Sequence, residues 1–146
     1  MFARVIYYSA SGAPAQDGYE QVDFDTLLST SDIVSVHAPL NEHTEGLMNA
    51  EAFHKMKKTG IFLNLGRGPI VVEEDLYQAL VEGEIAAAGL DVLCKEPMSE
   101  DNPLLAIKDS KKLLITPHIA WASVEARTNL MRIILGQIKE FKGGQV

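Results

Sequence analysis

The sequence predicts an α/β fold, in which a parallel sheet is flanked by helices. Two patterns support this prediction: short runs rich in Val, Ile and Leu alternate with amphipathic segments, and each run is continuously apolar. The alternation is typical of βα units and a parallel sheet. Continuously apolar strands are typical of a sheet that is covered on both faces.

The apolar runs are expected to be strands, with helices between them. The expected strands are 4–8, 32–37, 60–65, 85–92 and 112–116, with a short extra strand at 20–22. Asp23 is an acidic cap before a short helix at 24–28, and Asn49 is the expected N-cap of a helix at 50–57.

Two further helices are expected in the second half of the chain. Apolar residues recur at helical spacing over 73–82, and Gly83 follows where a C-cap would lie. A longer helix is expected over 123–142, which Ser123 is able to cap although no capping box is completed. Its apolar stripe comprises Leu130, Ile133, Ile134, Ile138 and Phe141.

Composition excludes several classes of protein. The 146 residues suffice for one domain. Thirteen Lys and Arg against 20 Asp and Glu give a net charge of −7, which argues against nucleic acid but leaves a small anionic ligand open. The single cysteine, Cys94, excludes an internal disulfide and a Cys-rich zinc cluster. Without a long apolar run, we expect a cytoplasmic protein that binds neither membrane nor metal.

The segment 64–71 contains the first candidate functional residue. Arg67 lies between Gly66 and Gly68, directly after an expected strand. The carboxyl ends of parallel strands form the ligand crevice of such a sheet. Glycines permit close approach of the backbone to a ligand, and the Arg67 guanidinium suits a carboxylate. The alternative is a tight turn with a surface arginine.

Two further segments place acidic and basic side chains at the same edge. Asp91 and Glu96 follow the expected strand 85–92, and His118 follows Pro117 after the strand 112–116. Taken alone, each carboxylate is more simply a solvated loop residue. An Arg, a Glu and a His at the ends of three successive strands, however, favour a catalytic site. Cys94 is interpreted as a packing residue.

These segments resemble the D-isomer-specific 2-hydroxyacid dehydrogenase family over essentially the whole chain. The family pattern of Asn, two small residues and Arg-Gly is present at 64–68. Gly-Leu-Asp-Val with a following Glu-Pro is present at 89–97, and Pro-His at 117–118. The stretch 32–40, followed by Thr44, resembles the cofactor-side strand and loop. Within the family, glycerate and hydroxypyruvate reductases are the nearest in character.

The resemblance implies hydride transfer between a nicotinamide cofactor and a small 2-oxo or 2-hydroxy acid. Arg67 would bind the carboxylate and carbonyl of the acid, and His118 would exchange a proton with its oxygen. Glu96 would hydrogen-bond the imidazole and orient it. The resemblance also assigns cofactor contacts to His37, Pro39, Thr44, Leu65, Gly66 and Asp91, the last to the nicotinamide carboxamide.

The choice of cofactor depends on Ser9, which aligns with the family's acidic residue for the adenosine ribose. Serine cannot make the paired contacts of a carboxylate and does not repel a 2′-phosphate, so NADP is not excluded. Because no basic residue follows Ser9 directly, we expect NAD.

No Gly-x-Gly-x-x-Gly motif occurs in the chain, and 4–8 resembles the second strand of the family's Rossmann sheet. The resemblance therefore implies a partial, Rossmann-like dinucleotide-binding domain over 1–146. It would lack the first strand, the glycine-rich loop and the substrate domain, and would end in the helix 123–142. We expect the isolated chain to be inactive, and to form homo-oligomers through strand edges and this helix.

An alternative function on the same fold is a non-catalytic module that senses dinucleotide or binds other proteins. The combination of Arg67, Glu96 and His118 favours the enzyme, because a scaffold has no need of these three side chains together.

Overall fold

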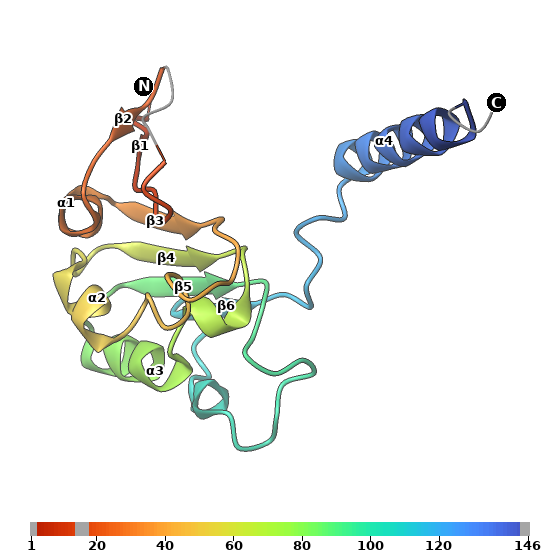
Figure 1. Cartoon of the computed structure of the whole chain (residues 1–146). Coiled ribbons are helices and arrows are strands. Elements are labelled where there is room, and N and C mark those ends of the chain that lie inside the picture. The colour runs from red at the N-terminus through yellow and green to blue at the C-terminus, as the bar shows by residue number, and fades with distance from the viewer. Residues whose placement is uncertain (1–2, 14–17, 144–146) are drawn as a thin grey trace.

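The computed structural model describes residues 3–13 and 18–143 (Figure 1). Most expected strands and helices are present close to their expected positions. In chain order, the elements are β1 (Ile6–Tyr7), β2 (Glu20–Gln21), α1 (Phe24–Thr30), β3 (Ile33–Val36), α2 (Ala50–Lys55), β4 (Ile61–Asn64), the 3₁₀ helix η1 (Gly68–Ile70), α3 (Glu73–Glu82), β5 (Ala87–Leu90), the 3₁₀ helix η2 (Pro103–Ala106), β6 (Leu113–Ile115) and α4 (Val124–Gly143).

The main sheet has the order β3-β4-β5-β6, and all of its strands run parallel. One row of paired residues crosses it from Val34 through Phe62 and Ala88 to Leu113. The predicted parallel α/β class is therefore confirmed. Strands β1 and β2 form a separate parallel pair, and within the described ranges they have no ladder to β3.

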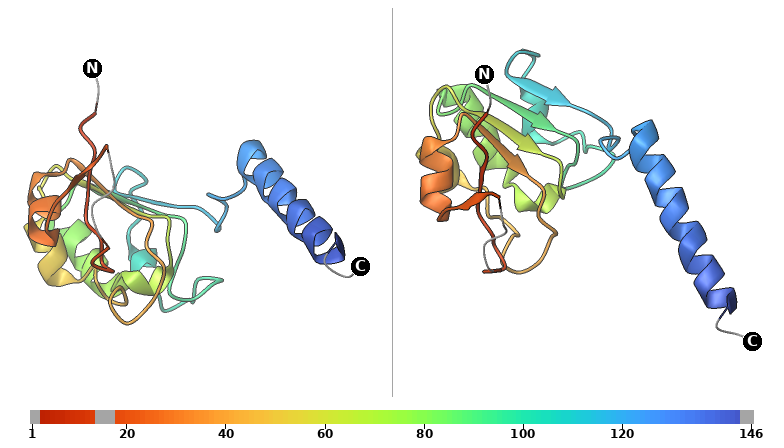
Figure 2. Two further views of the ribbon diagram at one scale, coloured as in Figure 1. Left: turned by 45° about the horizontal axis from the view of Figure 1, so that its top comes forward. Right: turned by 90° about the horizontal axis from the view of Figure 1, so that it is seen from above.

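Helices α1, α2 and α3 lie together beside the main sheet (Figures 1 and 2). Their inward side chains join the buried side chains of the sheet in one apolar cluster. Within this cluster, the buried aromatic rings of Phe53 in α2 and Phe62 in β4 meet edge to face, with their ring centroids 5.3 Å apart. This cluster is what holds the strands, and hence their carboxyl ends, in register.

The expectation that the strands are covered on both faces is wrong for the described residues. Ile33, Ile61 and Leu114 point away from the helices and are 58%, 38% and 62% exposed. An apolar run shows that both faces of a strand can be buried. It does not show that another part of the same chain packs against the second face.

Side-chain caps begin α1, α2 and α4 as the sequence predicts. Asp23 accepts a hydrogen bond from Thr26 N–H (2.8 Å), Asn49 from Ala52 N–H (3.1 Å) and Ser123 from Ala126 N–H (3.1 Å). Gly83 ends α3 with a left-handed φ of 73°. Helix α2 stops at Lys55 rather than at 57, because the backbone turns extended at the buried Met56.

Helix α4 stands away from the rest of the molecule (Figures 1 and 2). None of its described side chains is buried. The stripe predicted from Leu130 to Phe141 is present but open to solvent, with Leu130 50% and Phe141 70% exposed. Within the described ranges, no helix combines the length and the apolar character that crossing a membrane requires.

Candidate functional site

The loops that follow β3, β4, β5 and β6 meet at one edge, because the four strands are parallel. Arg67 lies in the loop after β4, Asp91 and Glu96 in the loop after β5, and His118 in the loop after β6. The structure thus brings the three predicted catalytic residues to one edge, on neighbouring strands, as the sequence indicates.

Asn64 shapes the loop that carries Arg67. Its side chain is fully buried; Nδ2 donates to the Arg67 carbonyl (3.0 Å), and Oδ1 accepts from Gly66 N–H (3.1 Å). The Arg67 side chain is exposed and donates from Nη1 to the Gly66 carbonyl (2.8 Å). The family motif includes Asn64 but does not reveal this role. The signal in the sequence is an asparagine two residues before a glycine at a strand end.

The glycines of this loop allow its backbone to pack directly against the backbone of the neighbouring loops. A Cβ on Gly66 would lie 2.9 Å from the Ala38 carbonyl oxygen, and one on Gly68 would lie 2.0 Å from the Leu93 carbonyl group. Both glycines admit the backbone of the neighbouring loops, which fixes the spacing of three loops at the edge. Close approach of a ligand to the same glycines stays a prediction.

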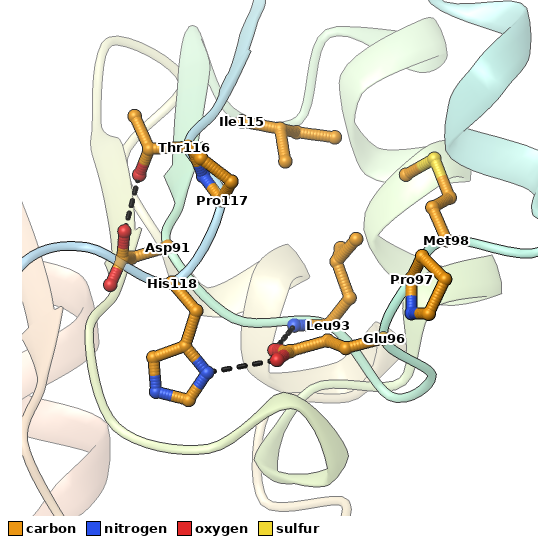
Figure 3. A pocket seen from close by; sticks show the side chains of 9 residues that line it. All are labelled: Asp91, Leu93, Glu96, Pro97, Met98, Ile115, Thr116, Pro117 and His118. Carbon is orange, nitrogen blue, oxygen red and sulfur yellow. Dashed lines mark hydrogen bonds and ion pairs between the residues drawn. The ribbon is translucent and has the colours of Figure 1, made fainter.

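Glu96 and His118 form a hydrogen-bonded pair, with 2.8 Å between Glu96 Oε2 and His118 Nδ1 (Figure 3). The other Glu96 oxygen accepts from Leu93 N–H (2.9 Å). The hydrogen bond to His118, followed by that from Leu93, lowers the pKa of Glu96 below its usual value. Pairing at Nδ1 leaves His118 Nε2 without a hydrogen bond within the described residues, and therefore available to a substrate.

Asp91 is almost fully buried behind this pair and organises the histidine loop. It accepts hydrogen bonds from the Thr116 hydroxyl, from Ile119 N–H (2.9 Å) and from Ala120 N–H (2.8 Å). Burial alone would raise the pKa of Asp91. The hydrogen bonds from Thr116, Ala120 and Ile119 outweigh burial, and the pKa lies below its usual value.

The backbone of His118 has a φ of 55°, a left-handed conformation that is uncommon outside glycine. The surrounding loop holds it there: its N–H donates to the Thr116 carbonyl (3.0 Å), and its carbonyl accepts from Trp121 Nε1 (2.9 Å). Such strain persists where neighbouring contacts over-determine the conformation, which is common at functional sites. Neither Thr116 nor Trp121 is predicted from the sequence to have a role at the site.

A cavity of about 350 Å³ lies beside the pair. Figure 3 shows His118 and Glu96 at one side of it and Met98 at the other. The lining side chains are mainly apolar and come from the loop after β5, from the end of β6 and from the loop that follows it: Asp91, Leu93, Glu96, Pro97, Met98, Ile115, Thr116, Pro117 and His118.

The residues expected at the cofactor are spread more widely. The His37 ring hydrogen-bonds Ser35 through Nε2 (2.9 Å), and Ser9 lies in the loop after β1 with its hydroxyl 3.1 Å from that of Ser11. Thr44 is buried and donates to the Pro39 carbonyl (2.7 Å), which closes the loop after β3.

Cys94 is exposed rather than packed in the core, and its thiol donates to the Val71 carbonyl (3.5 Å). Partial burial, and then the nearby carboxylate of Glu73, raise its pKa to about 11. A thiol with this pKa is protonated at neutral pH and is a poor nucleophile.

A parallel sheet flanked by helices, with Arg67 and a Glu–His pair on its carboxyl edge, places the chain among Rossmann-like α/β domains. The family model described as "D-isomer specific 2-hydroxyacid dehydrogenase, NAD binding domain" matches residues 1–120, and the chain belongs to this family. The resemblance found in the sequence is thereby confirmed.

Several characterised proteins are similar over nearly the whole chain. The chain is 46% identical to a hydroxypyruvate reductase of Blautia hydrogenotrophica over 143 residues, which are 97% of this chain and 44% of that protein. A D-lactate dehydrogenase with NAD⁺ from Lactobacillus jensenii has a TM-score of 0.81 at 32% identity, covering 97% of this chain and 46% of that one. An acyclic imino acid reductase in complex with NADPH and D-Arg has a TM-score of 0.83 at 32% identity, with 97% and 44% covered. The chain thus spans less than half the length of each.

Proposed function

We propose that the full-length protein reduces a small 2-oxo acid to the corresponding 2-hydroxy acid with a nicotinamide cofactor, NAD rather than NADP. The observation that carries the proposal is the Glu96–His118 hydrogen bond on the same sheet edge as Arg67. The 46% identity to a hydroxypyruvate reductase supports a short-chain substrate of that kind.

In this reaction Arg67 binds the substrate and His118 handles the proton. The exposed guanidinium pairs with the substrate carboxylate and polarises the 2-oxo group. As the carbonyl π bond breaks, protonated His118 gives its Nε2 proton to the oxygen; in oxidation, neutral His118 takes the proton back. Glu96 holds Nδ1, so that Nε2 faces the substrate.

The carboxyl edge fits the nicotinamide end of a dinucleotide. Exposed Pro39 and Leu65 offer apolar contact, with His37 and the backbone of Gly66 beside them. Thr44 would contribute indirectly, because its hydrogen bond to the Pro39 carbonyl closes the loop that contains Pro39. When bound, nicotinamide supplies the hydride to the carbonyl carbon.

Two of the proposed cofactor contacts are more restricted. Asp91 would meet the carboxamide through the one acceptor position that its three hydrogen bonds leave, since a carboxylate has about four lone-pair sites. Ser9 would contact the adenosine ribose through a single hydroxyl.

The proposal is tested by steady-state kinetics of the full-length protein with hydroxypyruvate and glyoxylate, each with NADH and with NADPH. His118→Ala should lower kcat by about 10²–10⁴-fold, and Arg67→Ala should raise KM for the oxo acid. His54→Ala is the matched control, because His54 also pairs through Nδ1 with a glutamate (Glu84, 3.1 Å) but lies on α2. Undiminished turnover in His118→Ala would overturn the proposal.

The alternative function is a module that senses dinucleotide or binds protein without turnover. The lowered pKa of Glu96 and its pairing with His118 favour catalysis instead. The same kinetics discriminate the two: a wild-type protein that binds NADH but reduces none of the oxo acids tested would favour the module.

Two further proposals concern the 146-residue chain itself. We propose that it binds NADH weakly and does not turn over, because it contains no Gly-x-Gly-x-x-Gly loop to hold the pyrophosphate. We also propose that it self-associates through the apolar stripe of α4. Reduction of hydroxypyruvate by the chain alone would contradict the first of these.

A further inference from the structure

Glu73, in the first turn of α3, contacts both ends of the segment that contains Glu96. Its Oε1 accepts a hydrogen bond from Cys94 N–H (2.9 Å), and its Oε2 accepts one from Asn102 Nδ2 (2.8 Å). Asn102 is buried, and its Oδ1 accepts from Leu104 N–H (3.0 Å), so its side chain has a single orientation. One carboxylate therefore fixes the segment 94–102 at its beginning and at its end.

The same stretch of chain also carries Arg67. Residues 67–73 run from the arginine through η1 into α3, and Gly68 within this stretch packs against the Leu93 carbonyl group. The stretch thus meets the loop after β5 at two places, at Gly68 and at Glu73. Together these contacts set the position of the Glu96 segment relative to Arg67.

We propose that Glu73 is a positioning residue for the reductase reaction, which fixes the Glu96–His118 pair relative to Arg67. The catalytic meaning of this role rests on the function proposed above. Glu73 acts through Cys94 and Asn102, and its carboxylate takes no part in the proton transfer. The neighbouring Glu74 is exposed and accepts only a 3.3 Å hydrogen bond from Gln78 in the same helix, so it is a matched control.

The first test needs no activity. The chemical shift of the Glu96 carboxyl carbon is measured by NMR as a function of pH in the 146-residue chain, and Glu96→Gln is used to assign the signal. The pKa of Glu96 is lowered mainly by its hydrogen bonds to His118 and Leu93 N–H, while the charge of Asp91 acts in the opposite direction. Loosening the segment weakens those hydrogen bonds. Glu73→Ala should therefore raise the midpoint towards that of an exposed glutamate, and Glu74→Ala should leave it unchanged.

The second test measures kcat and KM in the full-length protein. A displacement of about 1 Å at a catalytic group costs on the order of 10²-fold in rate, so Glu73→Ala should lower kcat by about 10- to 100-fold. KM for NADH should change little, and Glu74→Ala should match wild type. Glu73→Gln keeps an acceptor for Cys94 N–H but loses the one facing Asn102, so an intermediate kcat is expected.

An unchanged Glu96 midpoint in Glu73→Ala would overturn the proposal, as would an unchanged kcat in an active enzyme. If Glu73→Ala does not fold, the Glu96 midpoint and kcat are measured in Glu73→Gln instead, and the same two outcomes support or overturn the proposal. A full-length wild type without reductase activity would overturn the proposed function, whereas a shifted Glu96 midpoint would still support the positioning contact. The two failures are therefore distinguishable.

Discussion

Gly68 lies directly against the backbone of Leu93, so that a Cβ atom at position 68 would fall 2.0 Å from the Leu93 carbonyl carbon and oxygen. This approach joins the loop of Arg67 to the loop of Glu96. The backbones of Gly68 and Leu93 are so close that a side chain at position 68 has no room between them.

Replacement of Gly68 by alanine should therefore destabilise the chain. Forced overpacking costs about 1–3 kcal/mol, and a backbone partner cannot move aside as a flexible side chain does. Gly136→Ala is the opposite control, since a Cβ there meets nothing within 4 Å and lies inside α4. Because no described side chain of α4 is buried against the sheet, Gly136→Ala should favour the helical state of α4 by up to about 1 kcal/mol and leave the urea midpoint of the sheet unchanged. Urea denaturation of both variants tests the prediction, which two equal changes would contradict.

Asp91→Asn should lower stability in a pH-dependent manner. Asparagine keeps one oxygen, which still accepts from Thr116 and Ile119 N–H, but the amide nitrogen that replaces Oδ2 cannot accept from Ala120 N–H, and this loss should cost about 1–3 kcal/mol at pH 7. Because the pKa of Asp91 is lowered from 3.8 in the folded state, its stabilisation is present above that value and is lost as pH falls below it. The difference between wild type and Asp91→Asn, measured by urea denaturation, should shrink below about pH 4. A constant difference across this range would contradict the assignment.

Val72→Thr should stabilise α3. Val72 is the N-cap of this helix and makes no side-chain capping hydrogen bond, although threonine has nearly the same shape and supplies an acceptor. We expect a gain of about 0.5–1 kcal/mol in thermal or urea denaturation. Val71→Thr is the control: Val71 is buried, so the same change should destabilise.

Leu130→Glu with Ile134→Glu should abolish self-association through α4. Both side chains belong to the exposed apolar stripe and are 50% and 37% exposed. Thr128→Glu with Asn129→Glu makes a matched control, since it also adds two acidic residues to α4 but at positions outside the stripe. Sedimentation or light scattering at several concentrations measures the result. A monomeric wild type would contradict self-association outright.

The strand positions, and the sheet edge that carries Arg67, Glu96 and His118, could be predicted from sequence. Each of these three residues follows an apolar run, and parallel strands bring their carboxyl ends to the same edge whatever the conformation of the loops. The caps at Asp23 and Asn49 were likewise local enough to predict, since partner and cap lie three residues apart.

The roles of Asp91 and Glu73 could not be predicted in this way. Asp91 accepts from backbone N–H groups at 119 and 120, and any residue type supplies such a donor. Glu73 meets Cys94 N–H and Asn102 only after the sheet has formed. Such contacts carry no signal in the spacing of residues along the chain.

The left-handed backbone at His118 also has a mechanical consequence. Helix α4 has 20 residues, a rod about 30 Å long, and the segment from Thr116 to Ser123 is its connection to β6. A rotation of about 5° at His118 would move the far end of a helix of this length by about 2–3 Å. The backbone conformation of His118, the proposed proton donor, therefore also sets the direction of α4. The hydrogen bonds from Ile119 N–H and Ala120 N–H to Asp91 restrain this backbone.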